Sequence, residues 1–225
     1  MKERLGIFGG TFNPIHFGHL RAAVEVMENF SLDRIVFVPS AQPPHKNYTN
    51  IASAADRYEM TQLAIRSYSR FECSNIEIQR KGLSYTIDTI KEFQSSYSSN
   101  VQLFYLIGWD AFMAIHTWKS FERLFSEIPF IVMSRPDENH SMPYSIMVLR
   151  KLVPYVQLAV SQGYCLLEAD CRLVHKEKQT IYYSEVTALD ISATQIRALI
   201  HQQKSTHFLL PDPVESYIRD RRIYN

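Results

Sequence analysis

Short apolar segments alternate with amphipathic helical segments through the first 135 residues of this 225-residue chain, and the alternation constrains its fold more than any other feature. The expected elements are strands at 4–8, 34–38, 74–79, 101–107 and 130–133, and helices at 18–30, 54–68 and 85–93. The pattern predicts a Rossmann-like α/β fold, a doubly wound parallel sheet with helices on both faces. Ligands of such folds bind at the carboxyl ends of the strands, so the loops there are the candidate site.

The last third of the chain is less regular. From 136 to 182 the pattern blurs, with a polar turn, a helix expected near 145–152 and mixed apolar stretches. A strand at 180–186, a helix starting near Ser192 and a last helix after Pro213 follow. We therefore expect a single domain over residues 1–225, in which residues about 190–225 form a C-terminal helical part that carries the sequence ISATQIR.

A glycine pair, Gly9 and Gly10, directly follows the first expected strand in the segment GGTFNPIHFGHL (9–20). Without side chains, their backbone N–H groups can approach a phosphate closely, although an ordinary tight turn is the alternative. The segment matches neither the GxGxxG dinucleotide fingerprint nor the GxxxxGK[ST] P-loop. Neither a dehydrogenase nor a P-loop NTPase is therefore indicated, and another kind of phosphate site is expected.

Two histidines, His16 and His19, lie three residues apart where the first helix is expected to begin. Side chains at this spacing share one side of a helix, and the helix dipole is positive at this end, so both imidazoles could face one anion. Gly18 between them would leave room for a ligand against the backbone. Two structural histidines are the alternative, but their position after a strand and a glycine pair favours an anion site.

Composition indicates that any anion site is local. Lys and Arg number 24 against 23 Asp and Glu, a formal charge of +1 that gives no indication of a nucleic-acid partner. The opening MKERLGIFGG is too short for a signal peptide, and no uncharged apolar run reaches membrane-spanning length. The three cysteines lack the paired spacing of a zinc site and suit reduced thiols. We expect a cytoplasmic protein without a membrane partner or a dedicated metal site.

Together these motifs resemble those of one known family. GGTFNPIHFGHL resembles the opening of the bacterial nicotinate-mononucleotide adenylyltransferases, members of the nucleotidyltransferase superfamily with the [HT]xGH signature. The resemblance continues in order through PPHK (43–46), DRYEM (56–60), SYTIDT (84–89), IGWDAF (107–112), HTW (116–118), SRP (134–136), DISATQIR (190–197) and LPDPVESYIRDRRIY (210–224). It thus covers nearly the whole chain.

The resemblance implies a function and a set of site residues. The expected reaction transfers AMP from ATP to nicotinate mononucleotide, giving nicotinate adenine dinucleotide and pyrophosphate, with Mg²⁺ bound through the ATP phosphates. The catalytic residues it implies are His16, His19, Lys46 and Arg197. The ATP-binding residues would be Gly9, Gly10, Thr11, Phe12, His16, His19, Gly108, Asp110, Arg135, Ser192, Thr194 and Arg197. Nicotinate mononucleotide would contact Thr11, Phe12, Lys46, Thr86, Trp118 and Lys119.

The chemistry of individual residues is compatible with these roles, and each has a plainer alternative. Asp110 could accept hydrogen bonds from ribose hydroxyls or could cap a helix. Trp118 offers a flat face to a pyridine ring, although a lone Trp usually belongs to a core, and Thr86 could donate to a ring carboxylate. Lys46 could hold a phosphate or be a solvated loop lysine. Ala193 departs from the family pattern, because a second serine is common there.

Two further functions remain open at this point. Pantetheine-phosphate adenylyltransferase shares the phosphate apparatus but would not need the SYTIDT and HTW segments. A noncatalytic nucleotide-binding sensor on the same fold would be expected to have lost His16, His19 or Arg197, which are all present. Both a monomer and a homo-oligomer are compatible with the sequence.

Overall fold

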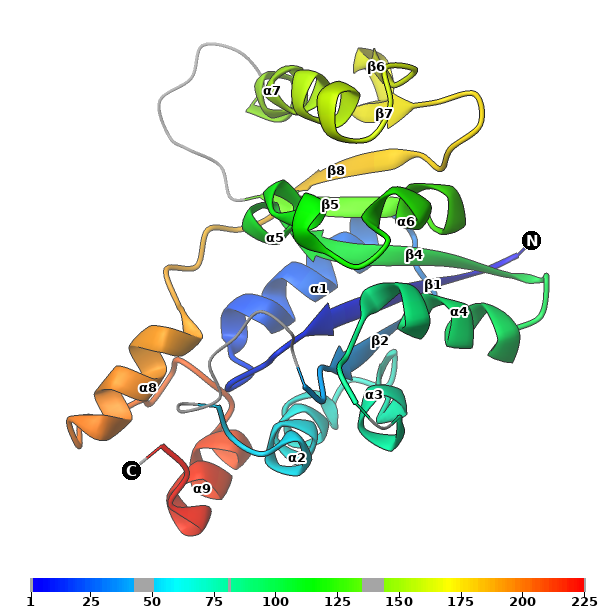
Figure 1. The fold of residues 1–225 in the computed structure, drawn as a ribbon. Helices are drawn as coiled ribbons and strands as arrows, with labels where there is room; N and C mark the ends of the chain where they lie inside the picture. Colours follow the sequence, from blue (N-terminus) through cyan, green and yellow to red (C-terminus); the bar gives the residue numbers. More distant parts are fainter. Residues whose placement is uncertain (1, 43–50, 81, 135–143, 225) are drawn as a thin grey trace.

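The computed structural model describes residues 2–42, 51–80, 82–134 and 144–224, with side chains from 146 onward in the last range (Figure 1). In this part of the chain eight strands form one sheet in the order β3-β2-β1-β4-β5-β8-β7-β6. The strands are β1 (Glu3–Gly10), β2 (Arg34–Pro39), β3 (Phe71–Cys73), β4 (Val101–Gly108), β5 (Phe130–Ser134), β6 (Cys165–Leu167), β7 (Arg172–Val174) and β8 (Ile181–Glu185). The six strands from β3 to β8 in this order are parallel, which confirms the doubly wound prediction.

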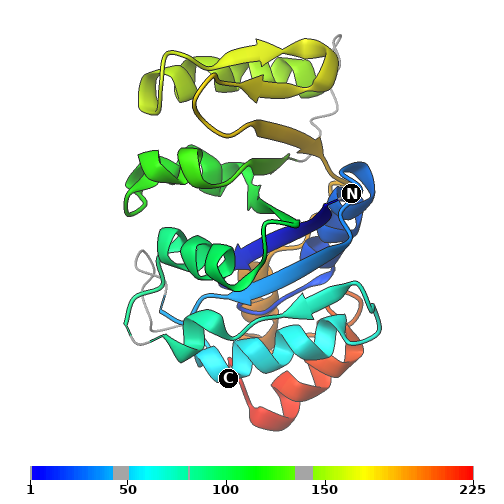
Figure 2. The same cartoon turned by 90° about the vertical axis from the view of Figure 1, so that its right-hand side faces the viewer.

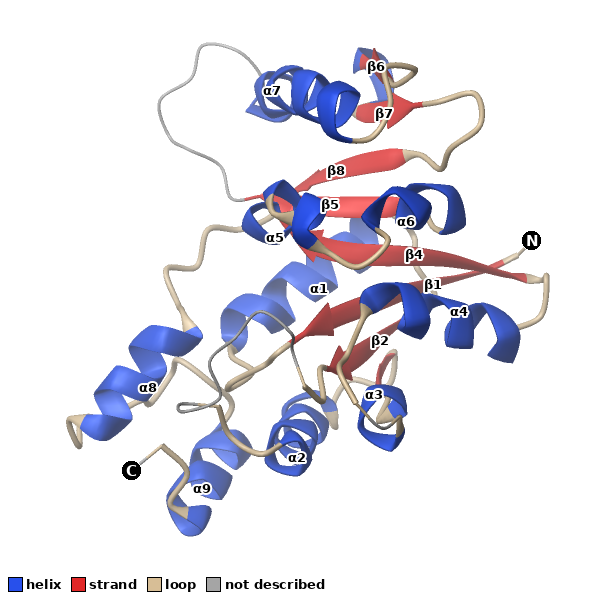
Figure 3. Ribbon diagram, in the orientation of Figure 1, coloured by secondary structure: helices blue, strands red, loops and turns tan. Residues whose placement is uncertain are grey.

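Helices cover both faces of the sheet. Figures 2 and 3 show α1 on one side of the strands and α4 and α6 on the other. Buried side chains divide in the same way, so one face carries α1 (Phe17–Asn29), α2 (Ala54–Ile65), α8 (Ala193–His201) and α9 (Asp212–Arg221). The opposite face carries α4 (Thr86–Ser96), α5 (Trp109–Met113), α6 (Phe121–Glu127) and α7 (Tyr144–Ala159). No helix in the described ranges is long and apolar enough to cross a membrane.

Strand β4 shows how the sequence gives two cores. Phe104 and Leu106 point to the face covered by α1, while Tyr105 and Ile107 point to the face covered by α4 and α5. All four side chains are at most 5% exposed. A strand buried on both faces must be apolar at every position, because successive side chains alternate between faces. This explains why 103–107 reads as a continuous apolar run.

The strand expected at 74–79 is wrong. The structure ends β3 at Cys73 and then forms a short helix, α3 (Ile76–Gln79). The side chain that this helix buries is Glu77, whose Oε1 accepts a hydrogen bond of 2.6 Å from Thr89 on α4. The alternation of Ile76 and Ile78 with polar residues therefore gave a wrong prediction, because the inward position belongs to Glu77, whose carboxylate is held through Oε1 by Thr89.

The C-terminal half contains elements that the sequence did not indicate. Beyond β8 the sheet continues with β7 and β6, which pair antiparallel, and the 3-10 helix η3 (Glu168–Asp170) lies between them. Helix α7 is longer than the expected 145–152. The chain then leaves β8 and returns past the first strands through α8, so that α9 packs against α2 (Figure 1). This return brings ISATQIR toward the amino-terminal half of the chain.

Candidate functional site

The carboxyl ends of β1 and β4 form the switch point of the sheet. These strands are neighbours, but β1 leads through α1 to β2 on one side and β4 leads to β5 on the other. A crevice is expected where connections diverge in this way. A cavity of about 450 Å³ is present there, lined by Gly9, Gly10, Thr11, Ser40, Ser84, Tyr85, Thr86, Tyr105, Ile107, Gly108, Ala111, Ala114, Thr117, Trp118 and Lys119. We call it the β1/β4 pocket.

Seven residues predicted from the sequence line this pocket: Gly9, Gly10, Thr11, Thr86, Gly108, Trp118 and Lys119. Gly9 has a packing reason to be glycine, since a Cβ there would collide with the hydroxyl of Tyr105. The absence of a side chain at Gly9 therefore makes room for the Tyr105 hydroxyl in the pocket lining. Tyr105 is 5% exposed, and burial raises the pKa of its hydroxyl, which stays protonated at neutral pH.

One wall of the pocket is the amino-terminal end of α4. Thr86 is the first residue of this helix and Tyr85 is its N-cap. The Thr86 Oγ1 lies 3.5 Å from the Tyr105 hydroxyl, at the limit of a hydrogen bond. The first N–H groups of a helix carry partial positive charge, so this wall favours an anionic ligand group.

Trp118 and Lys119, which follow the 3-10 helix η2 (Ile115–Thr117), form another part of the pocket lining. Trp118 is partly buried and meets the ring of Tyr105 edge to face, with centroids 6.4 Å apart. Lys119 Nζ lies 3.1 Å from Asp88 Oδ2 and 4.3 Å from the centre of the Tyr85 ring. The Lys119 charge is thus already paired with Asp88 of α4.

The histidine pair stands at the start of α1. His16 is the N-cap, and its backbone N–H donates to Nδ1 of His19 at 3.3 Å. The two rings lie with centroids 3.8 Å apart at an angle of 35°. A Cβ on Gly18 would lie 3.0 Å from His16 Nδ1, so the glycine makes room for this imidazole. The expectation that Gly18 also leaves room for a ligand stays a prediction.

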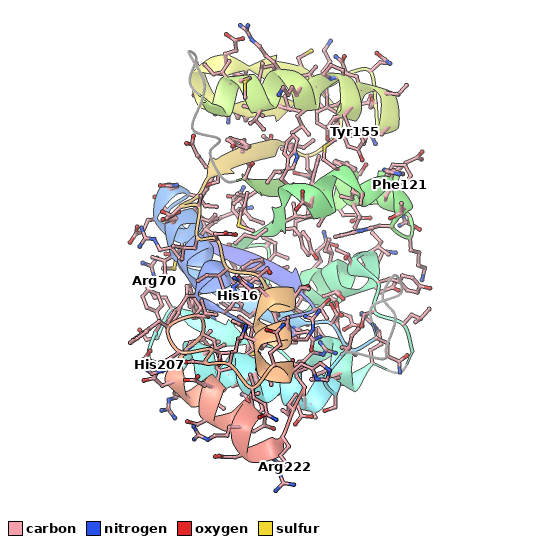
Figure 4. All side chains as sticks on the ribbon, turned by 90° about the vertical axis from the view of Figure 1, so that its left-hand side faces the viewer. His16, Arg70, Phe121, Tyr155, His207 and Arg222 are labelled. Carbon is pink, nitrogen blue, oxygen red and sulfur yellow. The ribbon has the colours of Figure 1, made fainter. Side chains whose placement is uncertain are left out.

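Helix α8 brings the ISATQIR residues to the histidine loop, as Figure 4 shows for His16 and the ribbon of α8. Arg197 Nη1 donates to the carbonyl of Asn13 at 2.8 Å, and Nη2 donates to Thr194 Oγ1 at 3.3 Å. Ser192 is the N-cap of the helix, and its Oγ accepts the N–H of Gln195 at 3.1 Å. The guanidinium is therefore oriented before any ligand binds.

Four other predicted residues are either outside the described ranges or not in the lining of the β1/β4 pocket. Lys46 and Arg135 lie outside the described residues. Phe12 is 3% exposed and its ring packs edge to face on His19, with centroids 5.2 Å apart, so only its backbone is available to a ligand. Asp110 is exposed in the first turn of α5, and Gly108, not Asp110, is the N-cap. Asp110 does not belong to the lining of the β1/β4 pocket.

Several residues that sequence reasoning missed hold these loops together. Asn13 Oδ1 accepts hydrogen bonds from the Ala52 N–H at 3.0 Å and from the Tyr224 hydroxyl at 2.6 Å. Ser84 Oγ accepts the N–H groups of Ala41 and Gln42 at 2.9 and 3.1 Å. Asn13, Ser84 and Tyr224 stand inside segments that carry the family resemblance, and this resemblance is the sequence signal that could have indicated them. Arg57, inside the DRYEM segment, also holds these loops, because it donates to the carbonyls of Thr11 and Ala41.

Comparison with known proteins gives an independent result. The model of the cytidylyltransferase-like family matches residues 7–199. A "probable nicotinate-nucleotide adenylyltransferase" of Desulfatibacillum aliphaticivorans is 45% identical over 224 residues, covering 98% of this chain and 99% of the relative. A relative with the same name from Geotalea daltonii is 40% identical over 222 residues, covering 99% and 98%.

Solved structures show the same architecture. The nicotinic acid mononucleotide adenylyltransferase of Plasmodium falciparum, complexed with NaAD, aligns with a TM-score of 0.69 over 99% of this chain and 97% of that one. The same enzyme complexed with APC aligns with a TM-score of 0.68. Sequence identity is 16% in both cases, so this likeness demonstrates a shared fold.

Proposed function

This chain belongs to the nicotinate-nucleotide adenylyltransferases of the cytidylyltransferase-like family, and from that membership we propose how its residues carry out the reaction. The enzyme transfers AMP from ATP to nicotinate mononucleotide in NAD biosynthesis, giving nicotinate adenine dinucleotide and pyrophosphate. The observation that carries the residue assignment is the β1/β4 pocket, which joins an aromatic wall to the positive end of a helix.

Nicotinate mononucleotide is proposed to occupy the β1/β4 pocket. Its pyridine ring would lie against Trp118, with its carboxylate toward the Thr86 hydroxyl and the first N–H groups of α4. A volume of about 450 Å³ lies within the usual range of small-molecule sites. Backbone groups of Gly9, Gly10 and Thr11 line the same pocket and lead toward the histidine loop. The 5′-phosphate of the mononucleotide would therefore reach that loop.

The chemical step needs no nucleophile from the protein. A 5′-phosphate oxygen of nicotinate mononucleotide attacks the α-phosphorus of ATP, a new P–O bond forms, and the bond to pyrophosphate breaks. Because the attacking phosphate is already ionised at neutral pH, the protein has to position the reactants and stabilise charge on the transferring and leaving groups. We assign this to His16, His19, Lys46 and Arg197.

His19 has a defined donor role in this proposal. Its Nδ1 accepts the backbone N–H of His16, so the neutral imidazole carries its proton on Nε2. An Nε2–H group at a helix amino terminus is suited to donate to a phosphate oxygen. The hydrogen bond within the helix start thus fixes the tautomer that the reaction needs.

The ATP side is assigned to the remaining predicted residues. Ser192, Thr194 and Arg197 gather at the start of α8, where hydroxyls, N–H groups and a guanidinium suit a triphosphate. Ala193 is the first helical residue and offers a backbone N–H but no hydroxyl. Gly108 and Asp110 at the end of β4 would bind the ribose, and Phe12 would contribute backbone only. Arg135 is assigned to the adenine side.

Nucleotidyltransferases of this kind use a divalent metal, and we propose Mg²⁺ held through the ATP phosphates. In the described part of the chain, three side chains that could together bind a metal ion, His207, Asp212 and Glu215, lie just before and within the first turn of α9. They are not part of the β1/β4 pocket lining, which fits a metal held through the ATP phosphates. Mg²⁺ would neutralise charge on the triphosphate, while Arg197 and the start of α8 orient it. The absence of a nucleic-acid partner and a cytoplasmic location remain predictions.

Pantetheine-phosphate adenylyltransferase is the runner-up, and the pocket distinguishes the two. Phosphopantetheine has no aromatic ring for Trp118 and no ring carboxylate for Thr86, so both walls would lack a partner. The test is to incubate purified protein with ATP, Mg²⁺ and either nicotinate mononucleotide or phosphopantetheine, and to follow pyrophosphate. Release with nicotinate mononucleotide is expected. Release with phosphopantetheine only would overturn the assignment, and release with neither would favour a noncatalytic sensor.

A further inference from the structure

Arg57 is an arginine that the reaction as described above does not use, and it is almost completely enclosed. It lies near the start of α2 and is 1% exposed. Its Nε donates to the Ala52 carbonyl at 3.0 Å, its Nη1 to the Thr11 carbonyl at 2.8 Å, and its Nη2 to the Ala41 carbonyl at 3.1 Å. Within the described ranges it forms no ion pair with a carboxylate.

An enclosed guanidinium among carbonyls is a costly arrangement. Burial lowers the pKa of Arg57, yet a guanidinium stays protonated in proteins, so the positive charge persists in the interior. Three carbonyl dipoles each accept a hydrogen bond from one of its three nitrogens without neutralising the charge. A leucine or methionine would fill a core position at lower cost, and this indicates that the charge or the fork of donors has a use.

The three carbonyls belong to described residues that follow β1 and β2, and Gly10 at the end of β1 and Ser40 after β2 both line the β1/β4 pocket. Thr11 is in the loop after β1, between the glycine pair and the histidines. Ala41 and Ala52 stand at the two ends of the loop after β2, on either side of residues 43–50, which include Lys46. One planar side chain therefore ties both loops to α2 and to each other.

The contact with Thr11 also sets the direction of a peptide group. Across a trans peptide plane the carbonyl and the following N–H point in opposite directions, so the Phe12 N–H points away from Arg57. In the described part of the chain, neither the Thr11 nor the Phe12 N–H has a hydrogen-bond acceptor. Phe12 holds a left-handed φ of 45°, an unfavourable conformation for a bulky residue that surrounding contacts must maintain. The Arg57 contact is one of those constraints.

We propose that Arg57 is a positioning residue for the phosphate site, which fixes the loop after β1 against the loop after β2 and adds a buried positive charge behind them. The negative ends of three peptide groups then face Arg57 and not the substrate phosphates. This inference rests on the proposed function, because it assumes that phosphates bind at these loops. It adds to that function a residue that touches neither substrate.

The test compares two substitutions. Arg57→Lys keeps the charge but offers a single ammonium, which cannot bridge three carbonyls in a plane, and Arg57→Met removes the charge while keeping the bulk. We expect Arg57→Lys to lower kcat about tenfold to a hundredfold, since small displacements of reacting groups have effects of that size. Its affinity for ATP, measured by titration calorimetry, should change less. Arg57→Met should lose kcat and bind ATP several-fold more weakly than Arg57→Lys.

Thr61→Val is the matched control for stability. Thr61 is completely buried one turn further along α2, and its hydroxyl donates to the backbone carbonyl of Arg57 at 2.7 Å. Its replacement should destabilise the same helix without changing either loop. We expect Thr61→Val to lower the melting temperature and to retain wild-type kcat and KM when assayed well below that temperature.

The possible outcomes separate the two proposals. Wild-type kcat and KM in folded Arg57→Lys would overturn the positioning role, even if Arg57→Met does not fold. Equal affinity of Arg57→Lys and a folded Arg57→Met for ATP would overturn the electrostatic part. If Thr61→Val lost as much kcat as Arg57→Lys, the loss would come from destabilisation of α2, and the positioning role would be overturned. Lack of turnover by the wild-type enzyme would instead contradict the proposed function.

Discussion

The backbone N–H of His16 donates to Nδ1 of His19 at a distance of 3.3 Å, which makes His19 both a capping residue of α1 and a candidate ligand of phosphate. A capping side chain has a restricted orientation, so the imidazole is held before substrate binds. Its remaining nitrogen, Nε2, carries the proton in the neutral ring. One hydrogen bond therefore connects the start of a helix to the donor that the chemistry requires.

His19→Ala should fold and should lose about a hundredfold or more in turnover, comparable to the loss of one preorganised donor to a developing oxyanion. The lost capping contact should cost about 1 kcal/mol of stability. Steady-state kinetics and thermal unfolding measure the two effects. His201→Ala, an exposed position at the end of α8, is the control and should retain full turnover. Near-wild-type turnover of folded His19→Ala would contradict the assignment.

Trp118→Ala should raise the KM for nicotinate mononucleotide much more than the KM for ATP, because Trp118 lines the β1/β4 pocket, where the mononucleotide is proposed to bind. Trp118→Phe, which keeps a flat ring, should lie between this variant and wild type. A core tryptophan would behave differently, with a stability loss of about 3–5 kcal/mol on truncation and similar effects on both substrates. That pattern would show that Trp118 is structural.

Tyr224→Phe should affect the site, whereas Tyr217→Phe should not. Burial raises the pKa of the Tyr224 hydroxyl, which donates to Asn13 in the loop after β1, while the Tyr217 hydroxyl donates to Asp56 on α2 at 2.9 Å. Each substitution should cost about 0.5–1.5 kcal/mol of stability. We expect only Tyr224→Phe to raise the KM for ATP several-fold, because Asn13 also holds Arg197. Identical kinetics of the two variants would rule out this connection.

The ion pair between His207 and Glu215, with Nδ1 and Oε2 3.1 Å apart, predicts a pH effect on stability. Its hydrogen bond to Glu215 raises the pKa of His207 above 6.5. Burial would raise the pKa of Glu215, but hydrogen bonds from His207 and Thr206 outweigh it and the pKa is lowered below 4.5. The contribution of His207 to the stability of the fold is fully present below pH 6.5 and is lost as the pH rises through its raised pKa. The contribution of Glu215 is present above pH 4.5 and is lost as the pH falls through its lowered pKa.

His207→Gln should therefore melt below wild type at about pH 5.5 to 6, and the difference should vanish near pH 9, where the imidazole is neutral in both states. Thermal unfolding followed by circular dichroism at the two pH values is sufficient. His201→Gln serves as the control, because His201 is exposed and at the far end of α8. A deficit that is equal at both pH values would show that charge is not the source of the effect.

The fold and much of the pocket could be predicted because the relevant signals are local. The apolar run around Tyr105, the glycine pair at Gly9 and the HTW segment that contains Trp118 are each read within about ten residues. Parallel topology then places the carboxyl ends of neighbouring strands together. The structure places Thr86, Trp118 and the glycine pair in the lining of one pocket, and their roles in binding stay predictions that the family resemblance supplied.

The remaining features depend on contacts that no local pattern encodes. Asn13 and Tyr224 are 211 positions apart, yet they share a hydrogen bond. Among the described residues Arg57 donates to backbone carbonyls, which are present at every residue, so its partners leave no trace in the sequence. Glu77 is buried, and Thr89 on another helix donates a hydrogen bond to its Oε1. In each case the position of a buried polar group depends on hydrogen bonds to residues from other elements of the fold.

The central claim is that the β1/β4 pocket recognises a pyridine carboxylate, and the most direct test compares nicotinate mononucleotide with nicotinamide mononucleotide. In the amide an NH₂ replaces one carboxylate oxygen and points a donor at the Thr86 hydroxyl and the start of α4. Each contact affected in this way costs roughly 1–3 kcal/mol. One or two such contacts predict that kcat/KM for the nicotinate form exceeds that for the nicotinamide form by about a hundredfold or more. Equal values would contradict the claim, because the pocket would then bind the ring without distinguishing its substituent.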